Sequence, residues 1–313
     1  MLKKIIFRYS LRKKYSALYD DLKYHINTLS VDIGERSLCR YSNLDTAANY
    51  IYSYFTSLGL KVFEENFTVE GFSLRNIYAE IKGESAKDFI IIGAHYDTVE
   101  NSAGANDNAS GIAALLEIAK LMKGKKPKNT VRFSAFTLEE PPFFATASMG
   151  SIKHIEFLRK ENKDPALMIN LDMLGFGSMF VKQNFPDKDM CGIYPARGNF
   201  LSLVSLPSCS HAVDFCSKIY NRYSSKKIVA AALPASVGGV ADSDHISFIK
   251  NGIPAVMFTD TGFLRNPNYH SPDDSINTIN FRFLSENVYT IYKLVKELSF
   301  RNLRSIRKKF FRI

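Results

Sequence analysis

Two short segments bring a histidine and two aspartates close together along the chain. Residues 93–97 read Gly-Ala-His-Tyr-Asp, and residues 106–111 read Asn-Asp-Asn-Ala-Ser-Gly. Four further candidate metal ligands follow: Glu139, Glu140, Asp172 and His270. The set provides two histidine ligands and three carboxylate ligands, with further carboxylates to spare, which is what two divalent metal ions that share a bridging carboxylate require. A single structural zinc ion more often uses cysteine, and the cysteines here lack Cys-x-x-Cys spacing.

The positions of these residues matter as much as their types. Most of them follow four candidate strands: the apolar run at 89–92, which is typical of a buried parallel strand, and residues 130–136, 166–171 and 254–258. Open α/β sheets bind their ligands at the carboxyl ends of such strands. We therefore expect the candidate ligands to gather at one edge of a sheet, where chance would have scattered them over both edges.

Each candidate also has an ordinary structural explanation when it is taken alone. A Glu-Glu pair usually lies on a solvated surface, and a histidine in a polar loop such as His270 is usually exposed. Asp107 could be only a helix N-cap, and Asp172 could cap the turn after its strand. Ser243-Asp244-His245 is best explained as the N-cap of a helix at 246–248. For the other five residues, their joint order and their places at strand ends favour a metal site.

Taken together, the motifs resemble those of the co-catalytic di-zinc aminopeptidase family, which is related to glutamate carboxypeptidases, glutaminyl cyclases and transferrin receptors. The matching residues follow the order of the family over most of residues 45–300: His95-Tyr96-Asp97, residues 104–111, Glu139-Glu140, Gly150-Ser151, Asp172, residues 243–245, residues 252–255 and His270. The resemblance implies an α/β fold with a mixed, mostly parallel central sheet and helices on both faces.

The resemblance also assigns roles, and it implies two zinc ions. Five residues would be the metal ligands: Asp107 as the bridge, His95 and Asp172 at one ion, and Glu140 and His270 at the other. Glu139 would be the general base. Asp97, two residues beyond His95, would fix the second ring nitrogen of that histidine. Mn²⁺ or Co²⁺ could replace zinc with these ligands. The family has a cis peptide after the bridging aspartate, so we expect one between Asp107 and Asn108.

The implied activity is hydrolysis of a peptide bond at one end of a peptide, most simply by an aminopeptidase. Residues 175–240 carry the fewest motifs, so we expect that region to set specificity. Residues 141–144 read Pro-Pro-Phe-Phe where the family usually has a short glycine-containing link, so the rim of the pocket is expected to differ. Four residues could wall an apolar side-chain pocket or could belong to the core: Met173, Phe176, Phe258 and Phe263.

Other activities on the same scaffold stay open. Arg265 lies five residues before His270 and could clamp a substrate carboxylate, which would suit a carboxypeptidase or a dipeptidase. Glutaminyl cyclases of the family depart from the Asp-Asn-Ala-Ser-Gly pattern, and inactive interaction proteins such as transferrin receptors lose metal ligands. This chain keeps the pattern, all five candidate ligands and the candidate base.

Basic residues are concentrated at the two ends of the chain. Residues 1–14 and 301–313 carry twelve lysines and arginines and no acidic residue. Without these charges the formal net charge of +10 becomes about −2 for the remainder. We therefore expect one peptidase domain over 15–299 between basic tails at 1–14 and 300–313. The tails could be solubilising ends, or they could bind weakly to anionic membranes; no nucleic-acid-binding motif accompanies them.

The remaining sequence features are those of a globular enzyme. No apolar run reaches the roughly 18 residues of a membrane-spanning helix, and no signal-peptide pattern is present, so we expect a cytoplasmic protein. The cysteines show no disulfide-rich pattern, although Cys209 and Cys216 could pair in an oxidising compartment. Helices are expected over 15–32, 43–58, 109–122 and 284–298, and additional strands over 61–67 and 76–81.

Overall fold

A computed structural model describes residues 16–303, except for the side chains of residues 85–88. Residues 1–15 and 304–313 lie outside this part of the chain, and they hold most of the two basic tails. The expected association of the tails with anionic membranes therefore stays a prediction. None of the described helices is both long enough and apolar enough to cross a membrane.

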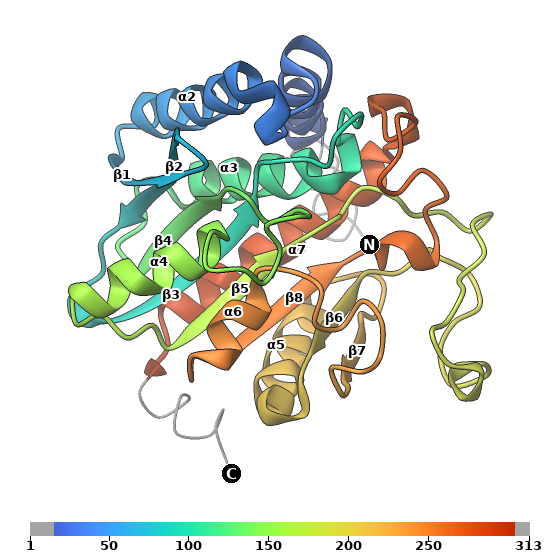
Figure 1. Ribbon diagram of the computed structural model, residues 1–313. Helices are drawn as coiled ribbons and strands as arrows, with labels where there is room; N and C mark the ends of the chain where they lie inside the picture. Colours follow the sequence, from blue (N-terminus) through green and yellow to red (C-terminus); the bar gives the residue numbers. More distant parts are fainter. Residues whose placement is uncertain (1–15, 304–313) are drawn as a thin grey trace.

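A mixed sheet of eight strands forms the centre of the molecule (Figure 1), in the order β1-β2-β4-β3-β5-β8-β6-β7. The strands are β1 (Lys61–Val69), β2 (Phe72–Ile81), β3 (Ser85–His95), β4 (Asn129–Phe136), β5 (Leu167–Leu171), β6 (Ser202–Ser205), β7 (Val229–Ala232) and β8 (Ala255–Thr259). The four central strands, β4, β3, β5 and β8, are parallel to one another. The β1–β2 hairpin is antiparallel and pairs with β4, and the parallel pair β6–β7 runs antiparallel to β8.

Helices cover both faces of this sheet, as the fold class predicts. One face carries α2 (Tyr41–Ser57), α3 (Ser110–Met122), α5 (Ser210–Tyr223) and α7 (Phe281–Ser299), which pack into one large apolar core. The other face carries α4 (Gly150–Lys160) and α6 (His245–Lys250), seen in front of the strands in Figure 1, and a smaller core. Because both faces are covered, every residue of β4, β5 and β8 is buried. This burial explains why β5 and β8 are mostly apolar in the sequence, whereas β4 also buries polar residues such as Arg132.

Each predicted element has a counterpart in the structure, but α4 (Gly150–Lys160) and the elements of residues 202–232 are not predicted. The expected helices correspond to a helix over 16–27 that continues into a π-helical turn (Thr28–Ile33), and to α2, α3 and α7. Residues 202–232 carry no predicted element, yet they form β6, α5 and β7. The two strands have only four residues each, which is too short for a hydrophobic period to stand out.

Candidate metal centre

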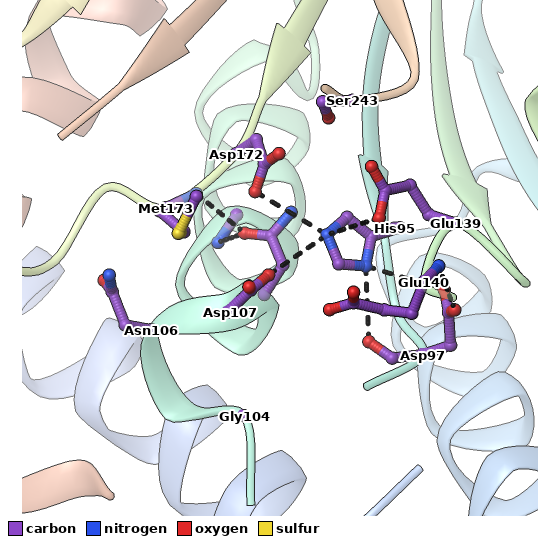
Figure 2. A network of polar contacts seen from close by, with 12 residues as sticks. His95, Asp97, Gly104, Asn106, Asp107, Glu139, Glu140, Asp172, Met173 and Ser243 are labelled. Atoms are coloured by element: carbon purple, nitrogen blue, oxygen red, sulfur yellow. Dashed lines mark hydrogen bonds and ion pairs between the residues drawn. The ribbon is translucent and has the colours of Figure 1, made fainter. Parts of the chain in front are cut away.

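The ends of the central strands place the candidate ligands at one edge of the sheet. His95 is the last residue of β3, Asp172 follows β5 directly, and Glu139 and Glu140 lie in the loop after β4. Asp107 lies in the turn that leads into α3, and His270 lies in the loop beyond β8. Figure 2 shows the His95 ring surrounded by carboxylates that come from these separate segments. The structure therefore agrees with the expectation that the candidate ligands lie together at one edge of the sheet.

His95 directs one ring nitrogen at three carboxylates. Its Nε2 lies 3.3 Å from Asp107 Oδ1, 3.6 Å from Asp172 Oδ1 and 3.8 Å from Glu139 Oε2. The opposite nitrogen, Nδ1, lies 3.5 Å from Asp97 Oδ1 and 3.2 Å from the carbonyl oxygen of Asp97. A partner at Nδ1 orients the ring and keeps Nε2 available to bind a metal ion.

His270 approaches the same aspartate from the other side. Its Nε2 lies 3.2 Å from Asp107 Oδ2 and 3.1 Å from Glu140 Oε2. The two oxygens of Asp107 therefore face two different histidines, each with a further carboxylate beside it. This is the arrangement that a carboxylate bridging two cations requires.

The chemistry of these donors fits divalent cations. Two overlapping groups offer ligand atoms within 4.8 Å of one another: His95, Glu139 and Asp172, and His95, Asp107 and Glu140. One buried oxygen each of Asp97, Glu140 and Asp172 has no hydrogen-bond partner. Buried carboxylates without partners are costly. A cation would supply the missing partner for Glu140 and Asp172, whereas the oxygen of Asp97 faces His95 Nδ1 at 3.5 Å. Imidazole and carboxylate donors together suit zinc.

The charges of the cluster are strongly coupled. Burial raises the pKa of Glu139 well above its usual range, against the effect of His95. Burial and the nearby Asp107 raise the pKa of Glu140 to about 8. Burial opposes the charge on His270, yet its contacts with Asp107 and Glu140 raise its pKa to about 10. The metal-free centre therefore retains protons, and binding of cations must release some of them.

A second layer of hydrogen bonds positions the Asp107 turn. The Asp274 carboxylate accepts the backbone N–H groups of Asn106, at 3.0 Å, and of Asp107, at 2.9 Å. The Asn108 side chain donates to Leu171 O at 2.9 Å. The peptide bond between Asp107 and Asn108 is cis, as the family resemblance predicts. Asp274 is not among the predicted site residues, because its local sequence gives no sign that its side chain contacts the distant Asp107 turn.

We expect Asp274→Asn to weaken metal binding by about 10–100-fold, the usual cost of losing a group that orients a ligand. An amide has one acceptor oxygen and cannot hold both N–H groups as the carboxylate does, so the Asp107 turn should loosen. Metal affinity can be measured by competition with a fluorescent chelator. Asp273→Asn is a matched control, because Asp273 is the exposed neighbour. Equal affinities in the two variants would contradict the positioning role.

An apolar hollow with a cavity volume of about 100 Å³ opens beside the cluster and touches it at Asp172 and Tyr269. We call it the apolar hollow. Its wall includes Met173, Phe185, Phe200, Val204, Met257 and Phe263. Two of the predicted pocket residues, Met173 and Phe263, are thus on its wall. Much of the lining comes from the 175–240 region, so the hollow is built largely by the segment that we expect to set specificity.

Two of the predicted pocket residues do not line this hollow. Phe258 is fully buried on the other face of the sheet, where its ring lies 5.7 Å from the ring of Tyr220. Its strand neighbours Met257 and Thr259 face the hollow instead, because successive side chains of a strand point to opposite faces. Phe176 is half-buried and contributes its backbone, since its N–H donates to Asp260 Oδ2 at 2.7 Å.

The contacts of Arg265 argue against its expected role as a clamp for a substrate carboxylate. The side chain is buried, and its guanidinium donates to Gln183 Oε1 at 2.9 Å and to Phe200 O at 2.9 Å. The Phe200 ring packs 4.5 Å from the guanidinium carbon. Arg265 therefore stabilises the wall of the apolar hollow, and its guanidinium interacts with groups inside the protein.

Tyr269 and the 243–245 segment complete the surroundings of the cluster. The Tyr269 ring stacks on the ring of His270 at 3.8 Å, a contact that the sequence analysis does not foresee. A helix does follow Ser243, as expected, but neither Ser243 nor Asp244 caps it. Ser243 Oγ instead accepts a hydrogen bond from Asn170 Nδ2 at 2.7 Å, one residue before the end of β5.

Comparison with known proteins gives a family match over most of the chain. The model of peptidase family M28 matches residues 76–295. An uncharacterized protein of Escherichia coli (strain K12), YfbL, is 34% identical over 285 residues, which cover 88% of this chain and 87% of that protein. A probable leucine aminopeptidase of Trichophyton verrucosum is 28% identical over 255 residues, or 77% of this chain. This chain spans only 59% of the length of that fungal protein.

A solved structure with the same fold is BSAP, a zinc aminopeptidase from Bacillus subtilis. It aligns with a TM-score of 0.73 over 90% of this chain and 95% of the other chain, at 19% sequence identity. At this identity the likeness establishes the fold, and it agrees with the sheet order and the layers described above.

Proposed function

We propose a function from the premise that this chain belongs to peptidase family M28: it is a zinc-dependent aminopeptidase that removes residues from the amino end of peptides. The observation that carries the proposal is the position of Asp107. One of its oxygens lies 3.3 Å from His95 Nε2 and the other 3.2 Å from His270 Nε2. A carboxylate held between two histidines by both of its oxygens is suited to bridging two cations and has no comparable purpose in packing.

In this proposal the chain holds two zinc ions through five residues. Asp107 contributes to both sites, His95 and Asp172 complete one, and His270 and Glu140 complete the other. The contact of Glu140 with His270, at 3.1 Å, favours Glu140 over Glu139 as the ligand of the second site. When bound, the ions would polarise the scissile carbonyl group and lower the pKa of a water molecule.

Glu139 is the candidate general base. Its carboxylate is buried beside the cluster, and burial raises its pKa, so it can accept a proton near neutral pH. It would take a proton from the attacking water and return it to the nitrogen of the leaving amine. Asp97 positions both Glu140 and His95. Its Oδ2 accepts a hydrogen bond from the Glu140 N–H at 3.0 Å, and its Oδ1 faces His95.

Recognition of the substrate follows from the surroundings of the cluster. The side chain of the first residue would occupy the apolar hollow, and its free amine would lie among the carboxylates near Asp172. A carboxypeptidase would need a free cation for the terminal carboxylate of its substrate. Arg265 is committed to Gln183 and to backbone carbonyls, so the arginine that would have favoured a carboxypeptidase does not support it.

The test is a set of three matched peptides. Leu-Gly-Gly and its carboxyl-terminal amide should both release leucine, whereas N-acetyl-Leu-Gly-Gly should react at least about 100-fold more slowly, because its blocked amine leaves buried polar groups unpaired. Released amino acids can be identified by mass spectrometry. Equal cleavage of the acetylated peptide, together with a requirement for a free carboxyl end, would establish the carboxypeptidase alternative. Cyclisation of amino-terminal glutamine without bond cleavage would establish a cyclase.

A further inference from the structure

We propose that a second hollow beside the cluster binds the residue that follows the scissile bond and favours lysine or arginine there. This inference rests on the aminopeptidase activity proposed above. It adds a preference at the second residue of the peptide, which the apolar hollow does not determine. The argument combines the position of the hollow, its charge and the shape of its walls.

The second hollow has a cavity volume of about 290 Å³ and touches the cluster at Asp97 and Glu140. We call it the acidic hollow. Four segments form most of its walls: Ser37, Leu38, Cys39 and Tyr41 before and at the start of α2, Glu70 and Phe72 of the β1–β2 hairpin, Asp97, Thr98 and Glu100 after β3, and residues 141–143 after the glutamate pair. The last of these is the Pro-Pro-Phe sequence that departs from the family pattern. Phe143 N–H donates to Glu140 O at 3.0 Å, which ties this wall to the cluster.

The two hollows reach the cluster at different residues. The apolar hollow touches Asp172 and Tyr269, and the acidic hollow touches Asp97 and Glu140. A peptide bond placed at the cluster has one residue on each side. With the first residue in the apolar hollow, the proposal places the leaving part of the peptide over the acidic hollow.

The charge of the acidic hollow favours a cation. Glu70 and Glu100 are exposed carboxylates on its wall, and among the residues that the structure describes no lysine, arginine or histidine lines it. Glu70 forms no ion pair within residues 16–303. Its backbone has φ 52° and that of Gly71 has φ 84°, which is typical of a tight two-residue hairpin turn. The short turn limits where this carboxylate can move.

The walls also suit the stem of a long cationic side chain. Phe72 is 37% exposed, and Pro141 and Pro142 are exposed beside the same space. Lysine and arginine cover apolar surface with their methylene groups while they keep the charged end in water. The acidic hollow therefore offers an apolar wall for the stem and carboxylates for the charge.

The experiment compares Leu-Lys-amide, Leu-Gln-amide and Leu-Glu-amide, each rate divided by that of leucine amide, which has no second side chain. We expect kcat/KM for the lysine substrate to exceed that for the glutamine substrate, and the ratio to fall about threefold in Glu70→Gln and in Glu100→Gln, as for exposed ion pairs. The preference should also decrease at high salt. Glu286→Gln on α7, a glutamate that pairs with Arg282, should leave the ratio unchanged.

A second measurement changes the charge of the hollow chemically. Cys39 is exposed on its wall, Cys191 is exposed elsewhere, and Cys209 and Cys216 are buried. In a Cys191→Ser chain, a trimethylammonium-bearing methanethiosulfonate at Cys39 should reduce the lysine preference, and the sulfonate-bearing reagent should not. This inference alone would be overturned if both glutamate variants and both reagents left the ratio of kcat/KM for the lysine and glutamine substrates unchanged. Failure to hydrolyse any free-amine substrate would overturn the proposed function instead.

Discussion

Glu139→Gln is expected to lower kcat by about 10²–10⁴-fold while the bound zinc stays unchanged. Glutamine has nearly the same shape as glutamate but cannot accept the proton of the attacking water. Because Glu139 is proposed to act beside the ions and not to hold them, its loss should affect the chemical step and spare metal content. Steady-state kinetics with leucine amide and elemental analysis of the same samples measure the two quantities together.

Glu140→Gln is the matched comparison for that experiment. Glu140 lies 3.1 Å from His270 Nε2, and as a proposed ligand it should lose metal when its charge is removed. The first group of possible ligands includes Glu139, with His95 and Asp172, so geometry alone allows either glutamate to bind metal. A Glu139→Gln protein that kept its activity, or that lost zinc as Glu140→Gln should, would reverse the two assignments.

Asp107→Ala is expected to reduce the zinc content from about two ions per chain to about none, because a bridging ligand contributes to both sites. His95→Ala and His270→Ala should each weaken chiefly one site, and so leave about one ion. His211→Ala is a suitable control, since His211 is an exposed histidine on α5. Elemental analysis after equilibration with zinc and gel filtration measures the stoichiometry.

The result for Asp107→Ala distinguishes a site that binds two metal ions from a site that binds one. If the unaltered chain bound a single ion, or if Asp107→Ala still retained one ion, the bridging role would be wrong. Circular dichroism of each variant should accompany the analysis, because an unfolded chain would lose metal for an unrelated reason.

Much of the centre can be predicted from the sequence, because its residues follow strands that are buried on both faces. The apolar run at 89–92 in β3 and the mostly apolar β5 and β8 mark strands, and the carboxyl ends of β3 and β5 mark the edge where His95 and Asp172 meet. Such runs carry no information about which face each side chain takes. From the sequence alone, Phe258 and Met257 are therefore equally good candidates for the wall of the apolar hollow. Only the pairing of β8 with its neighbours decides which of the two side chains faces it.

Residues whose partners lie far away along the chain could not be predicted in the same way. Arg265 is surrounded by residues of the 183–200 segment, and Asp274 holds the turn at Asn106 and Asp107. An arginine near a histidine ligand is equally compatible with a clamp for substrate and with a brace for the fold. The difference depends on whether buried backbone carbonyls surround it, which is a property of the tertiary structure.

The proposed ligands are spread over a long stretch of the chain, and this determines when during synthesis the activity can appear. The proposed ligands begin at His95 and end at His270, and Asp274 holds the Asp107 turn through two backbone N–H groups. A growing chain that has passed Asp172 has four of the five proposed ligands but lacks His270 and this support. Domains acquire their contacts as synthesis proceeds, so peptidase activity can arise only after His270 and Asp274 have been added. A chain that stops before them would hold an incomplete centre.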